Sequence, residues 1–511
     1  MVNHKTLSQS HVLVLGLGET GLASALWCLR QGAKLRVADT RDKPSGLAEI
    51  QSAAESRSDI EISYALGAAC LETKSLEGID SLVLSPGLSP NQSPVKEFLE
   101  QAKELGIEII GEIELFARAL ADLKNTQGYD CEVIAVTGTN GKTTVTMMAH
   151  EMLLASGVSA VAAGNISPAA LHALMEALDN NALPLVWVLE LSSFQLATVQ
   201  SLRPKASVVL NLSQDHLDWH LGWEDYVDHK AKLLHLSEIK IVSRLEDDVL
   251  AMVPDLEATD VMSFGEDEPE LMGDVGIQEV GGMAWLAARV GDDDFDIPLS
   301  AAAAHRKQAQ QSHREVGRLK QLMPVEAIPV QGRHNVLNGL AALALCSALK
   351  LNWGPLLRAL SSFQAAPHRM NFVRSIAGVD FINDSKGTNV GATLAAINGL
   401  ERPLLVILGG LAKGQDFSPL CQALKDKAKG IILIGHDAKS IEQALGSTGV
   451  TMTHAASMQE AVTTAMSQAN AGDIVLLSPA CASMDMFSNY MQRGFAFEEA
   501  VQEVALEHGE V

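Results

Sequence analysis

The sequence predicts an α/β protein with three domains, built on mainly parallel sheets. Short β-branched runs alternate with alanine- and leucine-rich stretches of helical composition along nearly the whole chain. The apolar runs are continuous rather than alternating, which is typical of strands covered by helices on both faces. A chain of 511 residues is also too long for one hydrophobic core, so several domains are expected.

The predicted strands fall into three groups along the chain. The first group contains His11–Gly16, Leu35–Asp39 and Ser81–Ser85. The second contains Val133–Gly138, Val186–Leu191 and Ser207–Leu212, and the third contains Leu404–Gly409, Gly430–Gly435 and Ile474–Ser478. A polar linker at residues 124–130 and a helical stretch at residues 335–363 separate the groups. We therefore predict domains at residues 1–125, 126–365 and 366–511.

The pattern weakens between Gly265 and Pro329. This stretch contains an acidic cluster (Asp292, Asp293, Asp294 and Asp296), followed by residues 301–322, which are rich in Ala, Gln, His and Arg. That composition predicts a helix over residues 301–322. We expect residues 266–329 to form a surface insertion without a catalytic role, and a contact with another protein is the alternative.

Composition and charge exclude several classes of protein. The net charge of −24 argues against a nucleic-acid partner, because phosphate backbones require a basic surface. The six cysteines include no C-x-x-C pair, so neither a disulfide framework nor a metal cluster is expected. The sequence contains no membrane-length apolar run and no secretory leader pattern. These features predict a cytoplasmic protein without a membrane span.

The strongest local motif is a predicted phosphate loop, Gly138-Thr139-Asn140-Gly141-Lys142-Thr143-Thr144. It lies between a strand and a helix, where successive backbone N–H groups can point at phosphate oxygens. Lys142 would reach the outer phosphates of ATP, and the Thr143 hydroxyl would bind magnesium. Val136 stands where the common form of this motif has its first glycine. A strand-to-helix turn with a surface lysine is the alternative.

A second glycine motif, Gly16-Leu17-Gly18-Glu19-Thr20-Gly21, follows the first strand, and Asp39 comes about 20 residues later. This pattern is typical of dinucleotide sites and supports a rival hypothesis, a nicotinamide-dependent oxidoreductase. The same glycines also occur wherever a helix packs closely on its strand. The motif is therefore weak evidence by itself.

Further polar clusters follow other predicted strands. His216 comes after the strand that ends near Leu212, and Lys230 lies fourteen residues later in a predicted helix. Glu190 ends its strand at the same expected edge of the sheet, where its oxygens could bind a hard cation. In the third domain, Arg369, Lys386 and Lys413 lie in loops where they could face the phosphate loop.

These motifs, in this order, resemble the Mur ligase family over nearly the whole chain. The matching segments are GLGETG (16–21), SPGL (85–88), GEIELF (111–116), GTNGKTT (138–144), GN (164–165), LELSSFQL (189–196), NLSQDHLDWH (211–220), GRHNVLN (332–338), PHRM (367–370), NDSKGTNVGAT (383–393) and LSPACASMD (477–485). The resemblance implies a Rossmann-like N-terminal domain for a UDP substrate and a central P-loop ATPase-type domain. A Rossmann-like C-terminal domain would receive the amino acid and close over ATP.

The resemblance also assigns expected roles to individual residues. UDP-substrate contacts are expected from Gly18, Glu19, Thr20, Asp39, Thr40, Arg41, Ser85, Gly87 and Asn165. Beyond the phosphate loop, ATP contacts are expected from Asn335, Asn338, Arg369, Asp384, Lys386 and Thr388. D-Glutamate contacts are expected from Lys413, Ser483 and Tyr490, where relatives often have phenylalanine in place of Tyr490. Two magnesium ions are expected at Thr143, Glu190, His216 and Lys230, with Lys230 carbamylated. The implied catalytic residues are Lys142, Lys230, His216, Arg369 and Lys386.

The expected activity is that of an ATP-dependent amide ligase. The resemblance implies that it adds D-glutamate to UDP-N-acetylmuramoyl-L-alanine through an acyl phosphate, as a monomer acting on small molecules in cytoplasmic peptidoglycan precursor synthesis. A folate polyglutamate ligase would share the phosphate loop, but should lack NDSKGTN and SPACAS. A dehydrogenase would leave Gly138–Thr144 without a role, and a nucleotide-sensing module would not need the cations of the third domain.

Overall fold

The structure is a computed structural model that describes residues 6–57, 59–216, 219–291, 313–330, 332–364, 367–412 and 414–510. The chain divides into two compact units. The first comprises Met1–Leu212, His216–Met323 and Leu340–Ala359, and the second comprises Ser213–Asp215, Pro324–Gly339 and Leu360–Val511. No helix within the described residues has the length and hydropathy needed to cross a membrane.

The first unit begins with a five-stranded parallel sheet in the order β3-β2-β1-β4-β5. Its strands are β1 (His11–Leu15), β2 (Lys34–Asp39), β3 (Ile62–Leu66), β4 (Ser81–Leu84) and β5 (Glu108–Ile110). Helices α1 (Glu19–Arg30), α2 (Leu47–Glu55) and α4 (Glu112–Gln127) cover one face, and α3 (Val95–Glu104) covers the other. The strand order reverses at β1, which confirms the predicted Rossmann-like arrangement.

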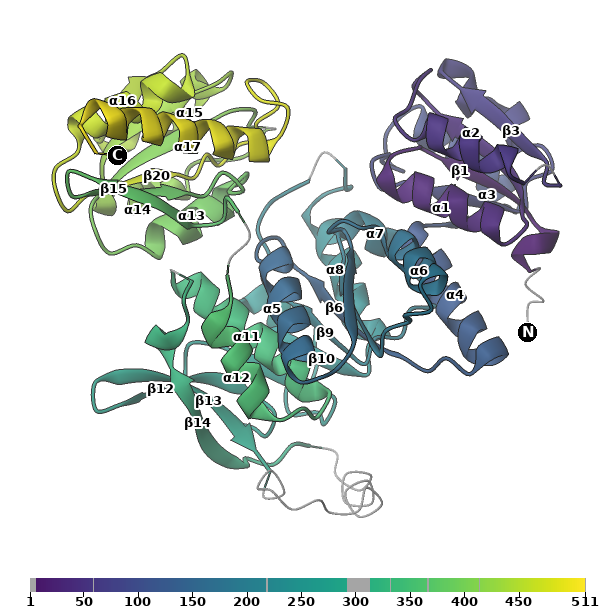
Figure 1. Cartoon of the computed structure of the whole chain (residues 1–511), viewed down its shortest axis with the longest axis horizontal. Coiled ribbons are helices and arrows are strands. Elements are labelled where there is room, and N and C mark those ends of the chain that lie inside the picture. The colour runs from purple at the N-terminus through teal and green to yellow at the C-terminus, as the bar shows by residue number, and fades with distance from the viewer. Residues whose placement is uncertain are drawn as a thin grey trace. The chain divides into compact units, whose positions relative to one another are not determined.

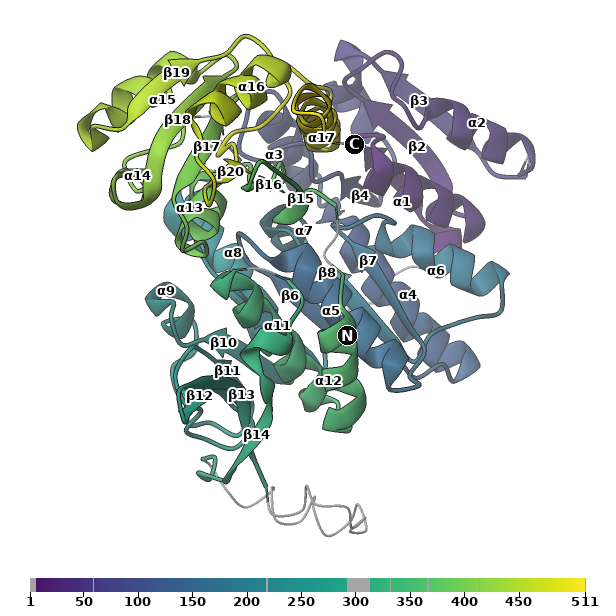
Figure 2. The same cartoon turned by 60° about the vertical axis from the view of Figure 1, so that its left-hand side comes forward.

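The second sheet of this unit has nine strands in the order β14-β13-β12-β11-β10-β9-β6-β8-β7. They are β6 (Glu132–Thr137), β7 (Ala160–Gly164), β8 (Val186–Glu190), β9 (Ala206–Val209), β10 (Ile239–Ser243), β11 (Val261–Phe264), β12 (Val275–Val280), β13 (Met283–Val290) and β14 (Arg318–Pro324). Pairing is parallel from β7 to β12 and antiparallel between β12 and β13. Figure 2 shows β6, β8 and β7 beside one another in this sheet.

Helices of the first unit surround its central sheet. They are α5 (Lys142–Ala155), α6 (Ala170–Asp179), α7 (Ser193–Ala197), α8 (Trp223–Leu236) and α9 (Asp247–Leu250), and both α11 (Arg333–Ala348) and α12 (Trp353–Ser362) are shared between the units. One continuous core joins the two sheets through α1, α4 and α6, and the ring of Phe116 on α4 packs edge-on against Trp187 of β8 at 5.1 Å between centroids.

The helix predicted over residues 301–322 is wrong at its C-terminal end. Residues 318–324 form β14, which pairs with β13 at the edge of the sheet. Sheet pairing and the packing of Met323 override the helical composition, because propensity alone contributes only tenths of a kcal/mol per residue. Residues 301–312 lie outside the described part of the chain. The insertion therefore contributes strands to the central sheet rather than lying wholly on the surface.

The second unit contains a six-stranded sheet in the order β15-β16-β20-β17-β18-β19. Its strands are β15 (Asn371–Ile376), β16 (Val379–Asn383), β17 (Leu404–Gly409), β18 (Ala428–Ile434), β19 (Thr451–His454) and β20 (Ile474–Leu477), all parallel except β15 against β16. Helices α13 (Val390–Asn398), α14 (Leu420–Lys427) and α15 (Ala438–Leu445) pack on one face. Helices α16 (Met458–Gln468) and α17 (Tyr490–Glu507) pack on the other (Figure 1).

Candidate active site

The loop between β6 and α5 has the geometry expected of a phosphate cradle. Gly138 has a φ of 145°, and a Cβ there would lie 3.0 Å from Leu210 Cβ, so only glycine fits. Gly141, with a φ of 84°, precedes Lys142, the first residue of α5. Asn211, which follows β9, holds this loop through two hydrogen bonds. Its backbone oxygen accepts from Thr139 N at 2.9 Å, and its Oδ1 accepts from Asn140 N at 2.8 Å. No local sequence signal identified this role of Asn211.

Two lysines approach the same carbonyl group of this loop. Lys142 Nζ donates to the backbone oxygens of Gly138 and Thr139, each at 2.9 Å. Lys230, from the predicted helix α8, is 2% exposed and donates to the Gly138 oxygen at 2.8 Å. The ring centroid of Tyr226 lies 4.7 Å from Lys230 Nζ, and its hydroxyl lies 2.7 Å from Thr139 Oγ1. The structure thus brings Lys230 to the phosphate loop, and it adds Tyr226, which the sequence analysis missed.

Glu190 ends β8 beside the cradle. Its register partners are Val136 on β6 and Gly164 on β7. Asn165 Nδ2 donates to Glu190 Oε1 at 2.7 Å. Glu190 is 2% exposed, and its second oxygen, Oε2, has no hydrogen-bond partner among the described residues. A buried carboxylate oxygen without a donor suits a hard cation such as magnesium.

The segment between β9 and α8 carries His216 in a left-handed conformation, with a φ of 56°. Its ring meets Phe194 of α7 edge-on at 4.7 Å between centroids. His220 follows it and is held by Ser193 and Asp225. Burial lowers the pKa of His220 to about 4, so its ring is neutral at physiological pH. Leu217 and Asp218 lie outside the described residues.

Most of the predicted UDP-site residues lie where β1, β2 and β4 end, whereas Asn165 follows β7. Ser85 Oγ donates to the Gly16 oxygen at 2.7 Å, and a Cβ on Gly21 would lie 1.8 Å from that same oxygen. These glycines therefore allow close packing, the simpler explanation of the motif. Asp39 accepts from Leu17 N at 2.6 Å and from two nitrogens of Arg41, each at 2.8 Å. Burial would raise the pKa of Asp39, but these hydrogen bonds, Arg41 first, lower it overall.

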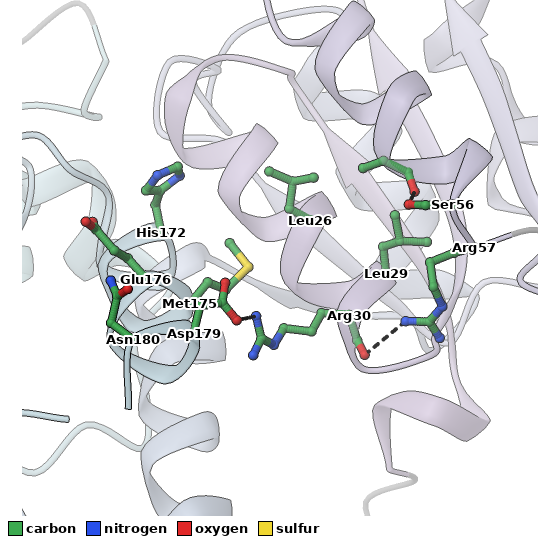
Figure 3. A pocket seen from close by; sticks show the side chains of 11 residues that line it. Leu26, Leu29, Arg30, Ser56, Arg57, His172, Met175, Glu176, Asp179 and Asn180 are labelled. Atoms are coloured by element: carbon green, nitrogen blue, oxygen red, sulfur yellow. Dashed lines mark hydrogen bonds and ion pairs between the residues drawn. The ribbon is translucent and has the colours of Figure 1, made fainter. Parts of the chain in front are cut away.

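The other predicted UDP contacts differ in exposure. Glu19 Oε1 accepts from Ser167 Oγ at 2.7 Å. Ser167 lies between β7 and α6, so this hydrogen bond links α1 to the region of the central sheet in the same unit. Gly18 and Thr20 are half-buried, and Thr40 and Gly87 are exposed. A separate pocket lies between α1, α2 and α6 (Figure 3), where Arg30 pairs with Asp179 at 2.6 Å. None of the predicted site residues lines that pocket.

In the second unit, Asp384 and Lys386 follow β16. Asp384 is buried, with Ser478 Oγ donating to its Oδ2 at 2.7 Å and Met370 N to its Oδ1 at 3.3 Å. Burial raises the pKa of Asp384 to about 7, and the Ser478 hydrogen bond and Arg369 oppose that rise. Lys386 Nζ lies 4.0 Å from the ring centroid of Tyr490, which joins a predicted ATP residue to a predicted D-glutamate residue.

Arg493 of α17 connects the loop after β16 with the loop after β20. It is not among the residues predicted from the sequence. It is 1% exposed and donates to Ser385 Oγ at 3.0 Å, to the Ser385 oxygen at 2.8 Å and to the Cys481 oxygen at 3.0 Å. No motif marks it, because Ser385 lies 108 residues away in the sequence.

Burial and hydrogen bonds place other predicted residues of this unit. Ser483 is 4% exposed, Thr388 N donates to the Lys386 oxygen at 2.8 Å, and Asn338 Nδ2 donates to Asn335 Oδ1 at 3.1 Å. Lys413 lies outside the described residues.

Three family models match consecutive parts of the chain: Mur ligase MurD-like, N-terminal domain at residues 10–111, Mur ligase middle domain at 136–346, and Mur ligase, glutamate ligase domain at 368–481. The UDP-N-acetylmuramoylalanine–D-glutamate ligases of Bordetella avium and Bordetella bronchiseptica are each 53% identical, over 98% of this chain and 97% of their own length. The solved MurF ligase from Thermotoga maritima in complex with ADP aligns with a TM-score of 0.54 at 14% identity, covering 98% of this chain and 100% of that one. At that identity the match shows a shared fold alone.

Proposed function

This chain belongs to the Mur ligase family, and we propose that it uses ATP to join D-glutamate to UDP-N-acetylmuramoyl-L-alanine. The observation that carries the proposal is 53% identity, over 98% of the chain, to curated ligases named for that substrate and that amino acid. The product is a peptidoglycan precursor, which links the protein to cell-wall synthesis and, through it, to cell shape and division. We place the reaction in the cytoplasm and the enzyme in the monomeric state.

In the proposed reaction, the L-alanyl carboxylate of the UDP substrate attacks the γ-phosphorus of ATP and displaces ADP. The acyl phosphate formed is attacked by the D-glutamate amine, and the tetrahedral intermediate expels inorganic phosphate. One proton leaves the amine as the amide forms. Positioning and charge compensation account for such a phosphoryl transfer, so no protein nucleophile is needed.

The phosphate loop supplies the first half of this site. The backbone N–H groups at the start of α5 bind phosphate oxygens. The Lys142 ammonium stabilises the negative charge of the γ-phosphoryl group during its transfer. The position of Lys142 supports this assignment, because its ammonium donates to the Gly138 and Thr139 oxygens of the loop itself. Asn335, Asn338, Arg369, Asp384, Lys386 and Thr388 are proposed to complete the ATP site.

Glu190, Thr143, His216 and Lys230 are the residues we propose for two magnesium ions. The buried Glu190 Oε2 without a hydrogen-bond donor supports the first ion, and the burial of Lys230 supports its carbamylation, because a desolvated amine favours the neutral form that reacts with carbon dioxide. Magnesium, when bound, offsets the charge of the phosphates as the substrate carboxylate approaches.

The remaining assignments follow from the same family membership. We propose that Gly18, Glu19, Thr20, Asp39, Thr40, Arg41, Ser85, Gly87 and Asn165 hold the UDP substrate, in place of the nicotinamide cofactor considered from the glycine motif. Lys413 and Ser483 are proposed to hold the carboxylates of D-glutamate, and Tyr490 to line the same pocket with its ring against Lys386. The domain boundaries at residues 125 and 365 are also retained as a proposal.

The test is release of inorganic phosphate from ATP with UDP-N-acetylmuramoyl-L-alanine and a panel of D- and L-amino acids. We expect release with D-glutamate and none with the L-isomer. The control is Lys142→Ala, which should abolish ADP release while leaving UDP-substrate binding intact. If no D-amino acid supports phosphate release, the proposed function is refuted, whereas normal turnover by Lys142→Ala would refute only the phosphate-loop assignment.

A further inference from the structure

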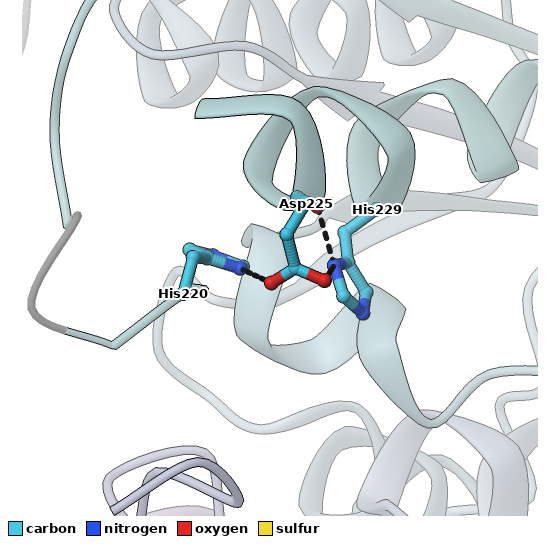
Figure 4. Close-up of side chains that lie close together, drawn as sticks. All are labelled: His220, Asp225 and His229. Atoms are coloured by element: carbon cyan, nitrogen blue, oxygen red, sulfur yellow. Dashed lines mark hydrogen bonds and ion pairs between the residues drawn. The ribbon is translucent and has the colours of Figure 1, made fainter. Parts of the chain in front are cut away.

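Three metal-ligating side chains meet at the start of α8, outside the set assigned to magnesium (Figure 4). Asp225 and His229 lie one turn apart on α8, and His220 reaches them from the preceding segment. His220 Nδ1 lies 3.0 Å from Asp225 Oδ2, and His229 Nδ1 lies 3.4 Å from Asp225 Oδ1. We propose that His220, Asp225 and His229 form a binding site for a divalent transition-metal ion of the zinc class.

The spacing of the donor atoms matches such an ion. Around tetrahedral zinc, with bonds of about 2.0–2.1 Å, neighbouring ligand atoms are separated by about 3.3 Å. The three ligand atoms all lie within 4.8 Å of one another, and the two separations to Asp225 already bracket that distance. Two imidazole nitrogens and one carboxylate are a donor set that favours zinc, cobalt or nickel over magnesium.

The surroundings of His220 are those of an oriented ligand. Its Nε2 lies 2.9 Å from Ser193 Oγ, a buried hydroxyl on α7. Metal binding through Nδ1 requires the ring proton to lie on Nε2, where it donates to Ser193, and no longer on Nδ1, which faces the Asp225 carboxylate at 3.0 Å in the metal-free protein. A histidine that binds a metal is commonly held by such a hydrogen bond from its other nitrogen.

The cluster is open to solvent on one side only. The side chain of His220 is fully buried, whereas those of Asp225 and His229 are 25% and 23% exposed. An ion can therefore enter past His229 and keep water as its fourth ligand, as three-ligand zinc sites do. Binding requires His229 Nδ1 to give up its hydrogen bond to the Asp225 backbone oxygen at 2.6 Å. Zinc-class ions displace protons from histidine readily at neutral pH.

Occupancy would have a structural consequence. The ion would tie the segment that carries His216 to the helix that carries Lys230, because His220 belongs to the first and His229 directly precedes Lys230. We therefore expect binding to stabilise this part of the chain against unfolding, since only the folded state brings the three ligands together.

The test is titration of the chelator-treated full-length protein with Co²⁺, without ATP or substrate. We expect one site with the visible absorption of tetrahedral cobalt, which Zn²⁺ abolishes by displacement. His229→Gln should weaken this site at least tenfold, because it removes a partly exposed ligand without disturbing the core. Circular dichroism checks that the variant is folded.

Two controls isolate the cluster. His235→Gln, at an exposed position on the same helix, and Glu190→Gln, at the proposed magnesium position, should leave the cobalt spectrum and affinity unchanged. Absence of the tetrahedral band, or a band that survives in folded His229→Gln, would overturn the proposal. Because the measurement uses neither ATP nor substrate, its failure would leave the proposed ligase function untouched.

Discussion

The Gly138 carbonyl oxygen accepts hydrogen bonds from both Lys142 and Lys230, whose positions in the sequence are 88 residues apart. Both side chains therefore meet at the turn where β6 passes into α5. Each lysine belongs to a different helix, so neither can serve as a simple substitute for the other. We therefore expect different effects from replacing Lys142, proposed to bind the ATP phosphates, and Lys230, proposed to bind magnesium.

We predict that Lys230→Ala lowers kcat by at least about 100-fold, because it removes a buried charged group at the phosphate loop. If the working form is a carbamate, a short carboxylic acid in the buffer should partly restore the rate. The measurement is phosphate release with and without the acid. Lys232→Ala is the matched control, because Lys232 lies on the same helix but donates to Leu196 and Ala197. Full activity of Lys230→Ala would exclude the carbamate.

Tyr490 offers a second test at this scale. The aromatic face that holds Lys386 is present in phenylalanine also, so Tyr490→Phe should retain kcat/KM for D-glutamate and ATP. Tyr490→Ala removes a cation–π contact of about 1 kcal/mol, which corresponds to about a fivefold loss. Steady-state kinetics of the two variants distinguish the ring from the hydroxyl. Equal damage from both substitutions would show that the hydroxyl, and not the ring, carries the effect.

At the scale of elements, the start of α4 meets the start of α6 through one carboxylate. Glu112 Oε1 accepts from Leu171 N at 2.6 Å, and its Oε2 is buried without a partner among the described residues. Burial, with a smaller contribution from Glu19, raises the pKa of Glu112 to about 7. The folded protein therefore holds a proton between about pH 4.5 and 7 that the unfolded chain releases.

The sign of the resulting pH dependence follows. The contribution of Glu112 to the free energy of unfolding is fully present below its unfolded pKa of about 4.5. It is lost as the pH rises towards 7. We predict that Glu112→Gln, which keeps an acceptor for Leu171 N, is about 2–3 kcal/mol more stable than the parent at pH 8 and nearly equal to it at pH 4.5. Denaturant unfolding of both proteins at the two pH values measures this difference. A difference that does not change with pH would contradict the prediction.

At the scale of the whole molecule, the central sheet extends through β11 to β14, beyond the strands that carry the proposed phosphate loop. Gly317, just before β14, lies close to Val290, the last residue of β13, because a Cβ on Gly317 would lie 2.9 Å from the Val290 oxygen. The start of β14 therefore lies beside the end of β13. The predicted catalytic residues all lie elsewhere in the sequence. We therefore expect residues of this extension to have no part in the proposed chemistry.

We predict that residues 292–312 can be replaced by a short Gly/Ser linker with kcat and KM changed by less than about twofold, since linker length adds little to the entropy of closure. The measurement is phosphate release, with thermal unfolding to confirm that the fold is intact. Loss of activity in a variant of unchanged stability would assign this segment a functional role.

The α/β class, nine of the strands and the glycine-rich loop after β6 follow from the sequence alone, because each is a local pattern: a continuous apolar run, or glycines spaced between a strand and a helix. The sequence also carried the family resemblance. The contacts of Asn211 and Tyr226 with the loop, and the contact of Arg493 with Ser385, could be seen only in the folded chain, because each joins residues at least 71 positions apart. The tertiary structure also made β14 a strand, since pairing with β13 satisfies backbone groups that a composition-based prediction cannot see.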